Sequence, residues 1–257
     1  MDNKQKLGSK TAKDGFKNEL SVIDIFNNWE TNDYAKKWLI AMDYHLGDIE
    51  HVEAHQISGY KTDVQVEIKV SIKLKHLTDI QNLQVKLVTN EEGARLIGKN
   101  QIDKRWVDTY QELWNIPENI VRILKHFTGE FPPYIDNPKD PRRMFINELS
   151  DQDSIALFNF LKVNQLLIVN DILKGRGKFS AEWMLVIIRN KKYKITHWVL
   201  KPINIVCNFF GNGEIIKSPQ GSVRIGKILM QRKGGDAGRP SANMLQFNID
   251  PTKLMDI

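Results

Sequence analysis

The chain has 257 residues, of which 41% are hydrophobic, and it carries a formal net charge of +6. This length allows one large domain or two small ones, and the positive charge suits a polyanionic partner such as nucleic acid. The single cysteine, Cys207, excludes a disulfide framework within the chain and a cysteine-rich zinc site. The N-terminus lacks the apolar stretch of a signal peptide and no run approaches the length of a membrane span, so we expect a cytoplasmic protein without membrane contact.

The spacing of apolar residues predicts helices and strands in the following order. Helices are expected up to about residue 29, then at 34–42, from 103, at 118–127, up to 163 after a Ser150–Asp153 cap, at 166–173 and at 203–210. Strands are expected at 49–57, 64–74, 83–87, 183–188, 195–200, 222–233 and 242–249, and residues 91–102 are expected to form a loop. Strands on both sides of a helical middle, without a clear linker, favour a single α/β domain over residues 1–257, with a central mixed β-sheet flanked by helices.

The stretch 59–90 has the clearest pattern in the chain. Apolar and polar residues alternate strictly over 64–74 and again over 83–87, which predicts two strands that are each buried on one face. Asp63 opens the first strand on its polar face, and Gln84 and Lys86 share the polar face of the second. An aspartate followed one strand later by Gln-x-Lys is the layout of a metal-dependent phosphodiesterase site, although a solvated surface hairpin has the same alternation.

The chemistry of this layout suits phosphodiester hydrolysis with Mg²⁺. Asp63, Gln84 and the carbonyl oxygen of Val85 are oxygen ligands of the kind that Mg²⁺ prefers, and Lys86 can stabilise negative charge on the phosphate. Strand alternation directs Gln84 and Lys86 to the site while Val85 anchors in the core. If Asp63 lies opposite Lys86, the hairpin centre falls between residues 74 and 75, so the first strand must end early or contain a bulge.

Two further segments carry side chains that suit the reading of DNA bases. The C-terminal QRKGGDAGRPSANMLQF gathers Arg, Lys, Asn and Gln around a glycine-rich loop, and NQIDK follows the second strand. Arg and Lys pair with guanine, Asn and Gln with adenine, and Asp accepts from cytosine. The alternatives are a solvated hairpin for the first segment and a simple helix cap, Asn100 or Asp103, for the second. Basic runs such as Arg142–Arg143 can contact phosphates or simply be solvated.

Several long blocks of the chain, among them SGYKTD, LQVKLVTN, NQIDKRW and QRKGGDAGRPSANMLQFNIDPTKL, carry a family resemblance. From about residue 7 to residue 257 the chain resembles the GCGC-cutting type II restriction endonucleases of the HinP kind, which are related to MspI. The resemblance implies a PD-(D/E)xK nuclease fold with a catalytic hairpin at about 59–90. Its implied catalytic residues are Asp63, Gln84, Lys86 and Glu19, the last being an acidic residue on a helix beside the site.

The resemblance also implies where DNA is bound. The DNA-reading segments fall at about 96–104 and 229–248, and the N-terminal block LGSKTAKDGFKNE adds a contact region. The implied DNA-binding residues are Ser9, Lys10, Asn100, Gln101, Asp103, Lys104, Gln231, Arg232, Lys233, Asn243 and Gln246.

The function that this resemblance implies is Mg²⁺-dependent hydrolysis of both DNA strands at GCGC, leaving 5′ overhangs. Its partners would be GCGC-containing duplex DNA and, as a genetic partner, a cognate cytosine methyltransferase. A palindromic target suits a homodimer, and a monomer that cuts the strands in turn is the other arrangement. Gln84 replaces the acidic residue usual in the wider superfamily, so a DNA-binding protein with a degenerate site is one alternative function. A structure-specific repair nuclease is the other.

Overall fold

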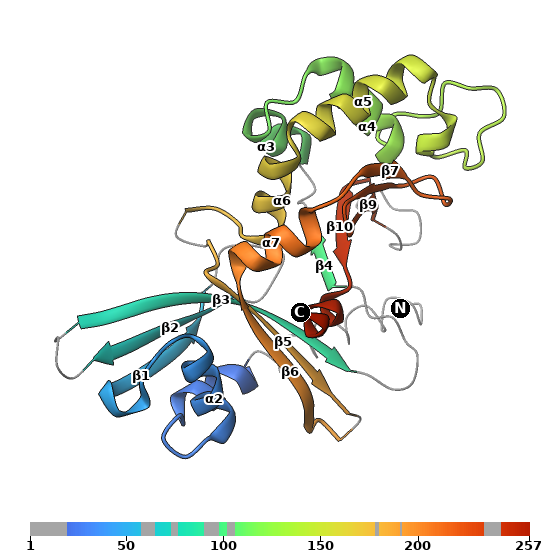
Figure 1. Ribbon diagram of the computed structural model, residues 1–257. Coiled ribbons are helices and arrows are strands. Elements are labelled where there is room, and N and C mark those ends of the chain that lie inside the picture. The colour runs from blue at the N-terminus through green and yellow to red at the C-terminus, as the bar shows by residue number, and fades with distance from the viewer. Residues whose placement is uncertain are drawn as a thin grey trace, which may run out of the picture. The chain divides into compact units, whose positions relative to one another are not determined.

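Figure 1 shows the computed structural model, which describes residues 20–57, 65–72, 77–89, 98–101, 106–177, 180–190, 192–233 and 243–257. The chain divides into two compact units. Unit 1 comprises residues 1–96, 175–206 and 250–257, and unit 2 comprises residues 97–174 and 207–249. The chain therefore leaves unit 1 twice and returns to it twice, and each unit is built from segments that are distant in sequence.

Unit 1 contains a five-stranded mixed sheet in the order β1-β2-β3-β5-β6 (Figure 1). Its strands are β1 (Ile49–Gln56), β2 (Gln65–Ile72), β3 (Leu77–Thr89), β5 (Trp183–Arg189) and β6 (Ile195–Pro202). Strands β3 and β5 are parallel, and the other neighbouring pairs are antiparallel. The expected α/β fold with a mixed sheet is thus confirmed, and β3 is an interior strand of that sheet.

Helices cover one face of this sheet and form the core of unit 1. Residues 20–27 are helical, and α2 (Asp33–Ala41) follows with Asn32 as its N-cap. The rings of Phe26 and Trp38 pack 5.3 Å apart, in a buried cluster with apolar side chains of β1, β2, β3 and β5. The amide of Asn27 exchanges two hydrogen bonds with the backbone of Ala54, which satisfies part of the open edge of β1.

The β2–β3 hairpin has the register that the catalytic layout requires. Gln65 pairs with Gln84 and Ile72 with Leu77, so the hairpin centre falls between residues 74 and 75, and no bulge interrupts the described pairs. Strand β2 ends at Ile72 and β3 begins at Leu77, not at residue 83. The polar residues at the start of β3, before residue 83, fit a solvated strand face. There the Thr78 and Ser71 hydroxyls lie 3.5 Å apart.

Unit 2 contains a second sheet, which is antiparallel throughout, in the order β4-β10-β9-β8-β7. Its strands are β4 (Gly98–Gln101), β7 (Ile215–Lys217), β8 (Val223–Ile225), β9 (Ile228–Arg232) and β10 (Leu245–Ile249). The prediction of a loop is wrong for residues 98–101, and the single strand predicted at 222–233 is two strands. The chain turns between them at Gly226, whose φ of 55° is readily adopted only by glycine.

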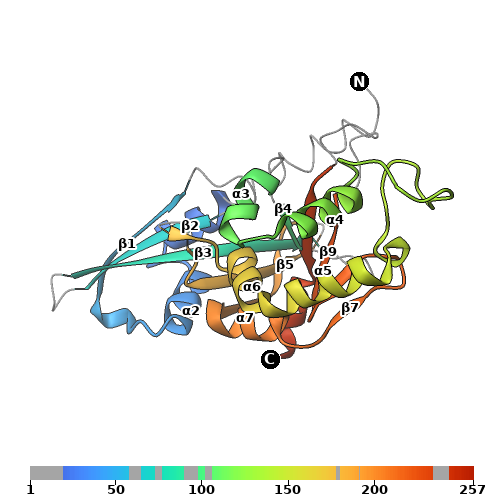
Figure 2. The same ribbon diagram turned by 90° about the horizontal axis from the view of Figure 1, so that it is seen from above.

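The helices of unit 2 pack on this sheet. They are α3 (Trp106–Leu113), α4 (Glu118–Thr128), α5 (Asp151–Val163) and α6 (Gln165–Leu173), while α7 (Ile203–Gly211) spans the boundary between the units. Helix α4 contacts β9, and α5 contacts α4 and β7 (Figure 2). Ser150 caps α5 by accepting a hydrogen bond from Asp153 N at 3.1 Å, as predicted. Cys207 is buried in α7, also as predicted, and burial raises the pKa of its thiol to about 11.

Short 3-10 helices complete the described part of the chain. They are η1 (Leu46–Asp48), η2 (Ile146–Glu148) and η6 (Pro251–Asp256), of which η6 contacts β5 and β6 in unit 1. Within the described ranges no single helix is long and apolar enough to cross a membrane. The bent pair α5 and α6 meets that test of length and composition only when both helices are taken together.

Gly129 ends α4 in the left-handed conformation, with φ of 87°. A Cβ atom added there would lie 2.6 Å from the carbonyl oxygen of Arg142, which is backbone and cannot easily yield. Gly177 also has a positive φ, of 57°, but a Cβ atom there would meet no atom of the described residues within 4 Å. Comparing substitutions at these two glycines therefore distinguishes the cost of backbone strain alone from the cost of strain plus a steric clash.

We expect Gly129→Ala to lower the free energy of unfolding by about 2–4 kcal/mol, since strain and a backbone clash act together. Gly177→Ala should cost only about 1 kcal/mol, from strain alone. Denaturant unfolding of both variants followed by circular dichroism measures this difference. Equal losses for the two variants would contradict the close approach of Arg142 to the end of α4.

Candidate active site

The central candidate residues lie on the interior strand β3. Asn82, Gln84 and Lys86 share one face of this strand and are 9%, 5% and 7% exposed. Leu83 and Val85 point to the opposite face and belong to the core cluster of unit 1. Strand alternation thus directs Gln84 and Lys86 to one side and anchors Val85 on the other, as the sequence predicted.

The neighbours of β3 explain why this polar row is buried. On β5, Met184 pairs with Gln84 and Val186 with Lys86, and both apolar side chains are 0% exposed. The outer strands β1 and β2 carry polar, more exposed residues on this face, such as His51 and Lys69. The Gln84–Lys86 pair therefore lies in a part of the sheet with little water, where electrostatic interactions are stronger than in solvent.

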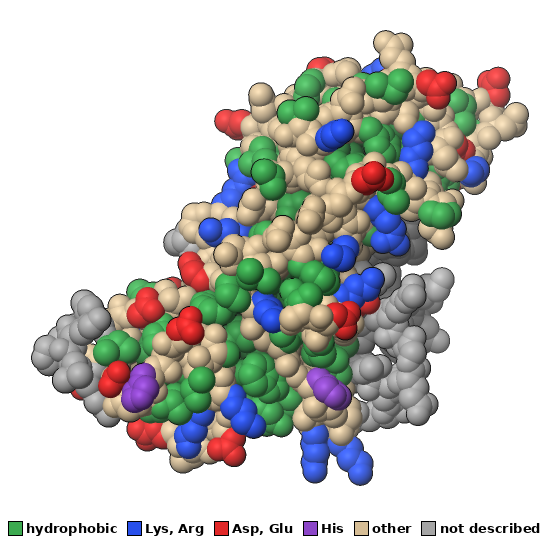
Figure 3. Space-filling view, viewed as in Figure 1, with side chains coloured by type: hydrophobic (Ala, Val, Ile, Leu, Met, Phe, Trp, Pro, Cys, Tyr) green, Lys and Arg blue, Asp and Glu red, His purple; other side chains and the backbone are tan. Residues whose placement is uncertain are grey.

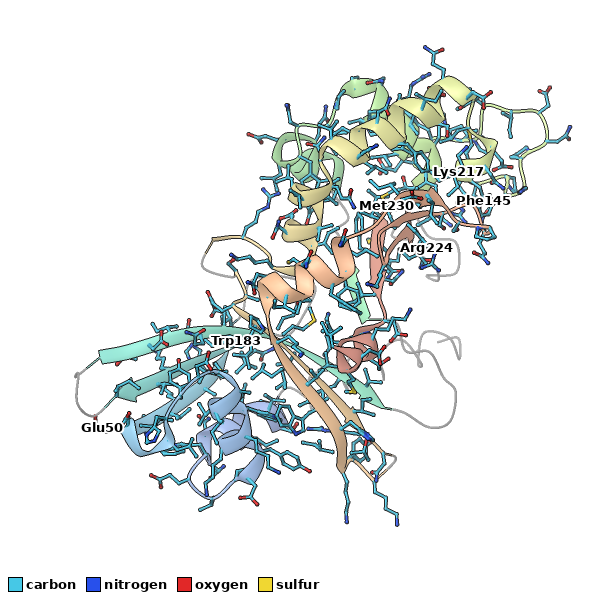
Figure 4. The ribbon with its side chains drawn as sticks, viewed as in Figure 1. Glu50, Phe145, Trp183, Lys217, Arg224 and Met230 are labelled. Atoms are coloured by element: carbon cyan, nitrogen blue, oxygen red, sulfur yellow. The ribbon has the colours of Figure 1, made fainter. Side chains whose placement is uncertain are left out.

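A small hydrogen-bond network fixes β3 against β5 just before this pair. Glu182 Oε2 accepts a hydrogen bond from Asn82 N at 2.6 Å, and Asn82 O accepts one from Glu182 N at 2.9 Å. Trp183, labelled in Figure 4, donates from Nε1 to Gln81 Oε1 at 2.8 Å. Sequence reasoning missed this network, although Asn82 stands two residues before Gln84 on the same face.

The carboxylates of the predicted metal site lie outside the described residues, namely Asp63 and Glu19. Of the predicted oxygen ligands, Gln84 and Val85 lie on the described part of β3. The described ranges contain no group of three or more His, Cys, Asp or Glu residues that could hold a metal ion. An amide oxygen and a backbone carbonyl are neutral donors that suit Mg²⁺, and the predicted carboxylate ligands are not among the described residues.

Unit 2 brings the two predicted DNA-reading segments together. Gln246 on β10 pairs with Gln101 on β4 and with Gln231 on β9, so the described strand of segment 96–104 adjoins the strands of segment 229–248 in one sheet. Gln231 Nε2 donates to Gln246 Oε1 at 3.2 Å. Gln246 is only 2% exposed, and its Nε2 has no hydrogen-bond partner in the described part of the chain. Three amide-bearing positions therefore form a row across the sheet.

Other predicted DNA-binding residues have structural contacts, or their side chains are not among those that the structure describes. Arg232 Nε donates to Thr128 O at 2.7 Å and Arg232 Nη2 to Asn243 Oδ1 at 2.8 Å, while Asn243 Nδ2 donates to Gly129 O at 2.8 Å. Lys233 N donates to Met244 O at 2.9 Å. Asn100 belongs to β4, but its side chain and that of Gln101 are not described. The predicted residues outside the described ranges are Ser9, Lys10, Asp103 and Lys104.

The charge on the face drawn in Figure 3 does not single out a DNA-binding region. Figure 3 shows Lys and Arg side chains distributed over the visible face of both units, with Asp and Glu between them. The assignment of an interface therefore depends on particular side chains and their contacts.

Comparison with known proteins identifies the family. No curated protein matches the chain. The family model described as R.HinP1I restriction endonuclease matches residues 42–255, which is well over half of the chain. This match includes the hairpin of β2 and β3 and both sheets. The chain therefore belongs to the R.HinP1I restriction endonuclease family and is a site-specific deoxyribonuclease.

Proposed function

We propose that this restriction endonuclease cleaves double-stranded DNA at GCGC by Mg²⁺-dependent phosphodiester hydrolysis and leaves 5′ overhangs. The observation that carries the proposal is the buried Gln84–Val85–Lys86 segment on the interior strand of a mixed sheet, in a chain of this family. A lysine and an amide that are both more than 90% buried do not fit the solvated face of a surface hairpin, which favours a catalytic role.

The register of the hairpin supports Asp63 as the third member of the site. The described pairs run up to Gln65 opposite Gln84. If the same register continues by two residues beyond the described part of β2, Asp63 is the partner of Lys86. We therefore propose Asp63 and Glu19 as the carboxylate ligands, with Gln84 and the Val85 carbonyl completing the oxygen set.

The roles of the chain's own residues follow from this arrangement. A bound Mg²⁺ ion polarises the scissile phosphate and lowers the pKa of the attacking water. Lys86 stabilises the negative charge that gathers on the phosphate and orients the attacking water. Gln84 contributes a neutral oxygen, so the site carries one negative charge fewer than a site with Glu at this position. The side chain of Val85 holds the strand in the core while its neighbours face the substrate.

The sheet of unit 2 supports the reading of the target sequence. The amides of Gln231, Gln246 and Gln101, together with Arg232 and Lys233, come from neighbouring strands or directly follow one. Lys is a usual partner of guanine, so Lys233 is proposed to contact guanine, and Asp103 is proposed to accept from a cytosine amine. We propose that Ser9, Lys10, Asn100, Lys104 and Asn243 add further DNA contacts.

The proposal extends to the setting of the enzyme. It acts in the cytoplasm as one endonuclease domain made of both units, beside a cytosine methyltransferase that protects the host's own GCGC sites. A homodimer suits the two-fold symmetry of this target.

In the test of function, the purified protein is incubated with phage DNA in the presence of Mg²⁺, and the fragment ends are sequenced. We expect discrete fragments that end at GCGC with 5′ overhangs, and no cutting in the presence of EDTA. DNA binding without cleavage in either Mg²⁺ or Mn²⁺ would favour the degenerate DNA-binding protein that Gln84 suggests. Preferred cutting of mismatched or branched DNA would favour a repair nuclease.

Lys86→Ala should lower the single-turnover cleavage rate by at least about 100-fold, because charge stabilisation at the phosphate is lost. Its affinity for GCGC duplex in Ca²⁺, measured by fluorescence anisotropy, should change little. Lys69→Ala is the matched control, since Lys69 lies on the same face of the sheet but pairs with Ile80. Normal cleavage by Lys86→Ala would refute the assignment of the active site.

A further inference from the structure

A cluster of arginines surrounds the C-terminal end of α4 in unit 2. Arg232 donates from Nε to Thr128 O at 2.7 Å, so its guanidinium is fixed to the last turn of this helix. Asn243 donates to Gly129 O at 2.8 Å and accepts from Arg232 Nη2 at 2.8 Å. Arg232 and Asn243 come from opposite sides of segment 234–242, within the stretch proposed to read DNA.

Two more arginines approach the same helix end from another part of the chain. Met144 N donates to His126 O at 2.9 Å, which holds residues 142–144 along α4. A Cβ atom built on Gly129 would lie 2.6 Å from Arg142 O, 3.4 Å from Arg143 Cβ and 3.4 Å from Asn243 Oδ1. Arg142, Arg143 and Arg232 therefore converge on the glycine that ends α4.

The positive charge of this cluster is only partly balanced. Asp140 holds Arg142 with two hydrogen bonds, from Nε at 2.9 Å and from Nη2 at 3.0 Å, and lies 3.7 Å from Arg143 Nε. The Arg142 guanidinium lowers the pKa of Asp140 to about 2, so this carboxylate stays ionised at neutral pH. Both carboxylate oxygens of Glu148 already accept backbone N–H groups, from Lys139 and Phe145.

The arginines also repel one another. Burial and then the charge of Arg232 lower the pKa of Arg143, and burial and then the charge of Arg142 lower the pKa of Arg232. All three stay protonated, because the pKa of arginine begins far above neutral pH. An anion bound among them would relieve this repulsion.

The guanidinium groups are held in fixed orientations, and some of their N–H donors make no hydrogen bond to the described residues. Arg143 stacks on the ring of Phe145 with Cζ 4.0 Å from the centroid, and only 16% of its side chain is exposed. Phe145, labelled in Figure 4, in turn packs against the turn at Gly221. Among the described residues, Nη1 of Arg142 and of Arg232 and both terminal nitrogens of Arg143 have no hydrogen-bond partner. Guanidiniums held in this way suit the oxygens of a phosphate group.

We propose that Arg142, Arg143 and Arg232 bind a backbone phosphate of the DNA substrate at the C-terminal end of α4. This inference rests on the proposed function, because DNA is the phosphate-bearing ligand of the enzyme. Contacts with phosphates fix the register of a protein on the duplex without reading sequence. The site would hold unit 2 in register on DNA while other residues of segment 229–248 read bases.

The test is the salt dependence of DNA binding by Arg143→Gln, measured by anisotropy in Ca²⁺ with a GCGC duplex and a duplex lacking GCGC. We expect affinity for both duplexes to fall by about ten-fold. The slope of log K against log[KCl] should become shallower by roughly 0.9, since one phosphate contact is lost. Arg143→Lys should recover part of the affinity, because it keeps the charge but not the planar fork.

Arg224→Gln is the matched control, since Arg224 is an exposed residue on β8 of the same sheet and its removal changes the net charge equally. It should leave the slope nearly unchanged. Arg142→Gln removes an exposed member of the cluster and keeps the test decisive if Arg143→Gln misfolds. For Arg142→Gln we also expect a shallower slope.

The other outcomes are distinct. If the cluster only caps α4, Arg143→Gln lowers the unfolding temperature but keeps the DNA affinity and slope of the control, which overturns the proposal. If the site takes free phosphate ions, inorganic phosphate stabilises wild type but not Arg143→Gln while DNA binding is equal, which also overturns it. A wild-type protein that does not bind DNA would instead refute the proposed function.

Discussion

Strand β3 is buried on both faces and yet carries polar residues on one of them. The arrangement of unit 1 depends on this combination. Its core face, with Leu83 and Val85, joins the helices to the sheet. Its other face carries Asn82, Gln84 and Lys86, all less than 10% exposed, before the row becomes apolar at Val88. Stability alone would favour apolar residues at these positions, because burying a lysine or an amide costs free energy. Their presence on a buried face is the reason for proposing that the active site lies on this face.

Residue patterns predicted the parts of the fold that depend on local periodicity. The alternation around Val66 and Val85 identified the core face, and the hairpin centre required by Asp63 and Lys86 agrees with the observed register. Strand β4 escaped prediction because GKNQ has no apolar alternation, and it is a strand only through pairing with β10, far away in sequence. The contact of Asn82 with Glu182 also joins distant segments, which no pattern in a single sequence reveals.

The division into two units follows from the parallel pairing of β3 and β5. Parallel strands need a long crossover, because the chain must return to the same end of the sheet. Here residues 97–174 form that crossover and contribute most of the helices of unit 2. The second excursion, residues 207–249, completes the antiparallel sheet, in which β10 pairs with β4 of the first excursion. Each excursion supplies one of the two segments proposed to read DNA. Both excursions are therefore needed to form the proposed DNA-reading sheet.

The end of α4 shows how one set of contacts can serve both stability and binding. The C-terminus of a helix carries roughly half a negative charge, which stabilises nearby cations. Arg232 uses this charge directly, through its hydrogen bond to Thr128 O. Asp140 and Glu148 are the described carboxylates that act on Arg143, and with the helix end they do not fully balance three guanidiniums. A structural cap needs only one cation, so the second and third arginines exceed what α4 requires. Together with the two carboxylates and the helix end, the three guanidiniums leave a net positive charge of roughly 0.5, which favours an anion such as a phosphodiester group.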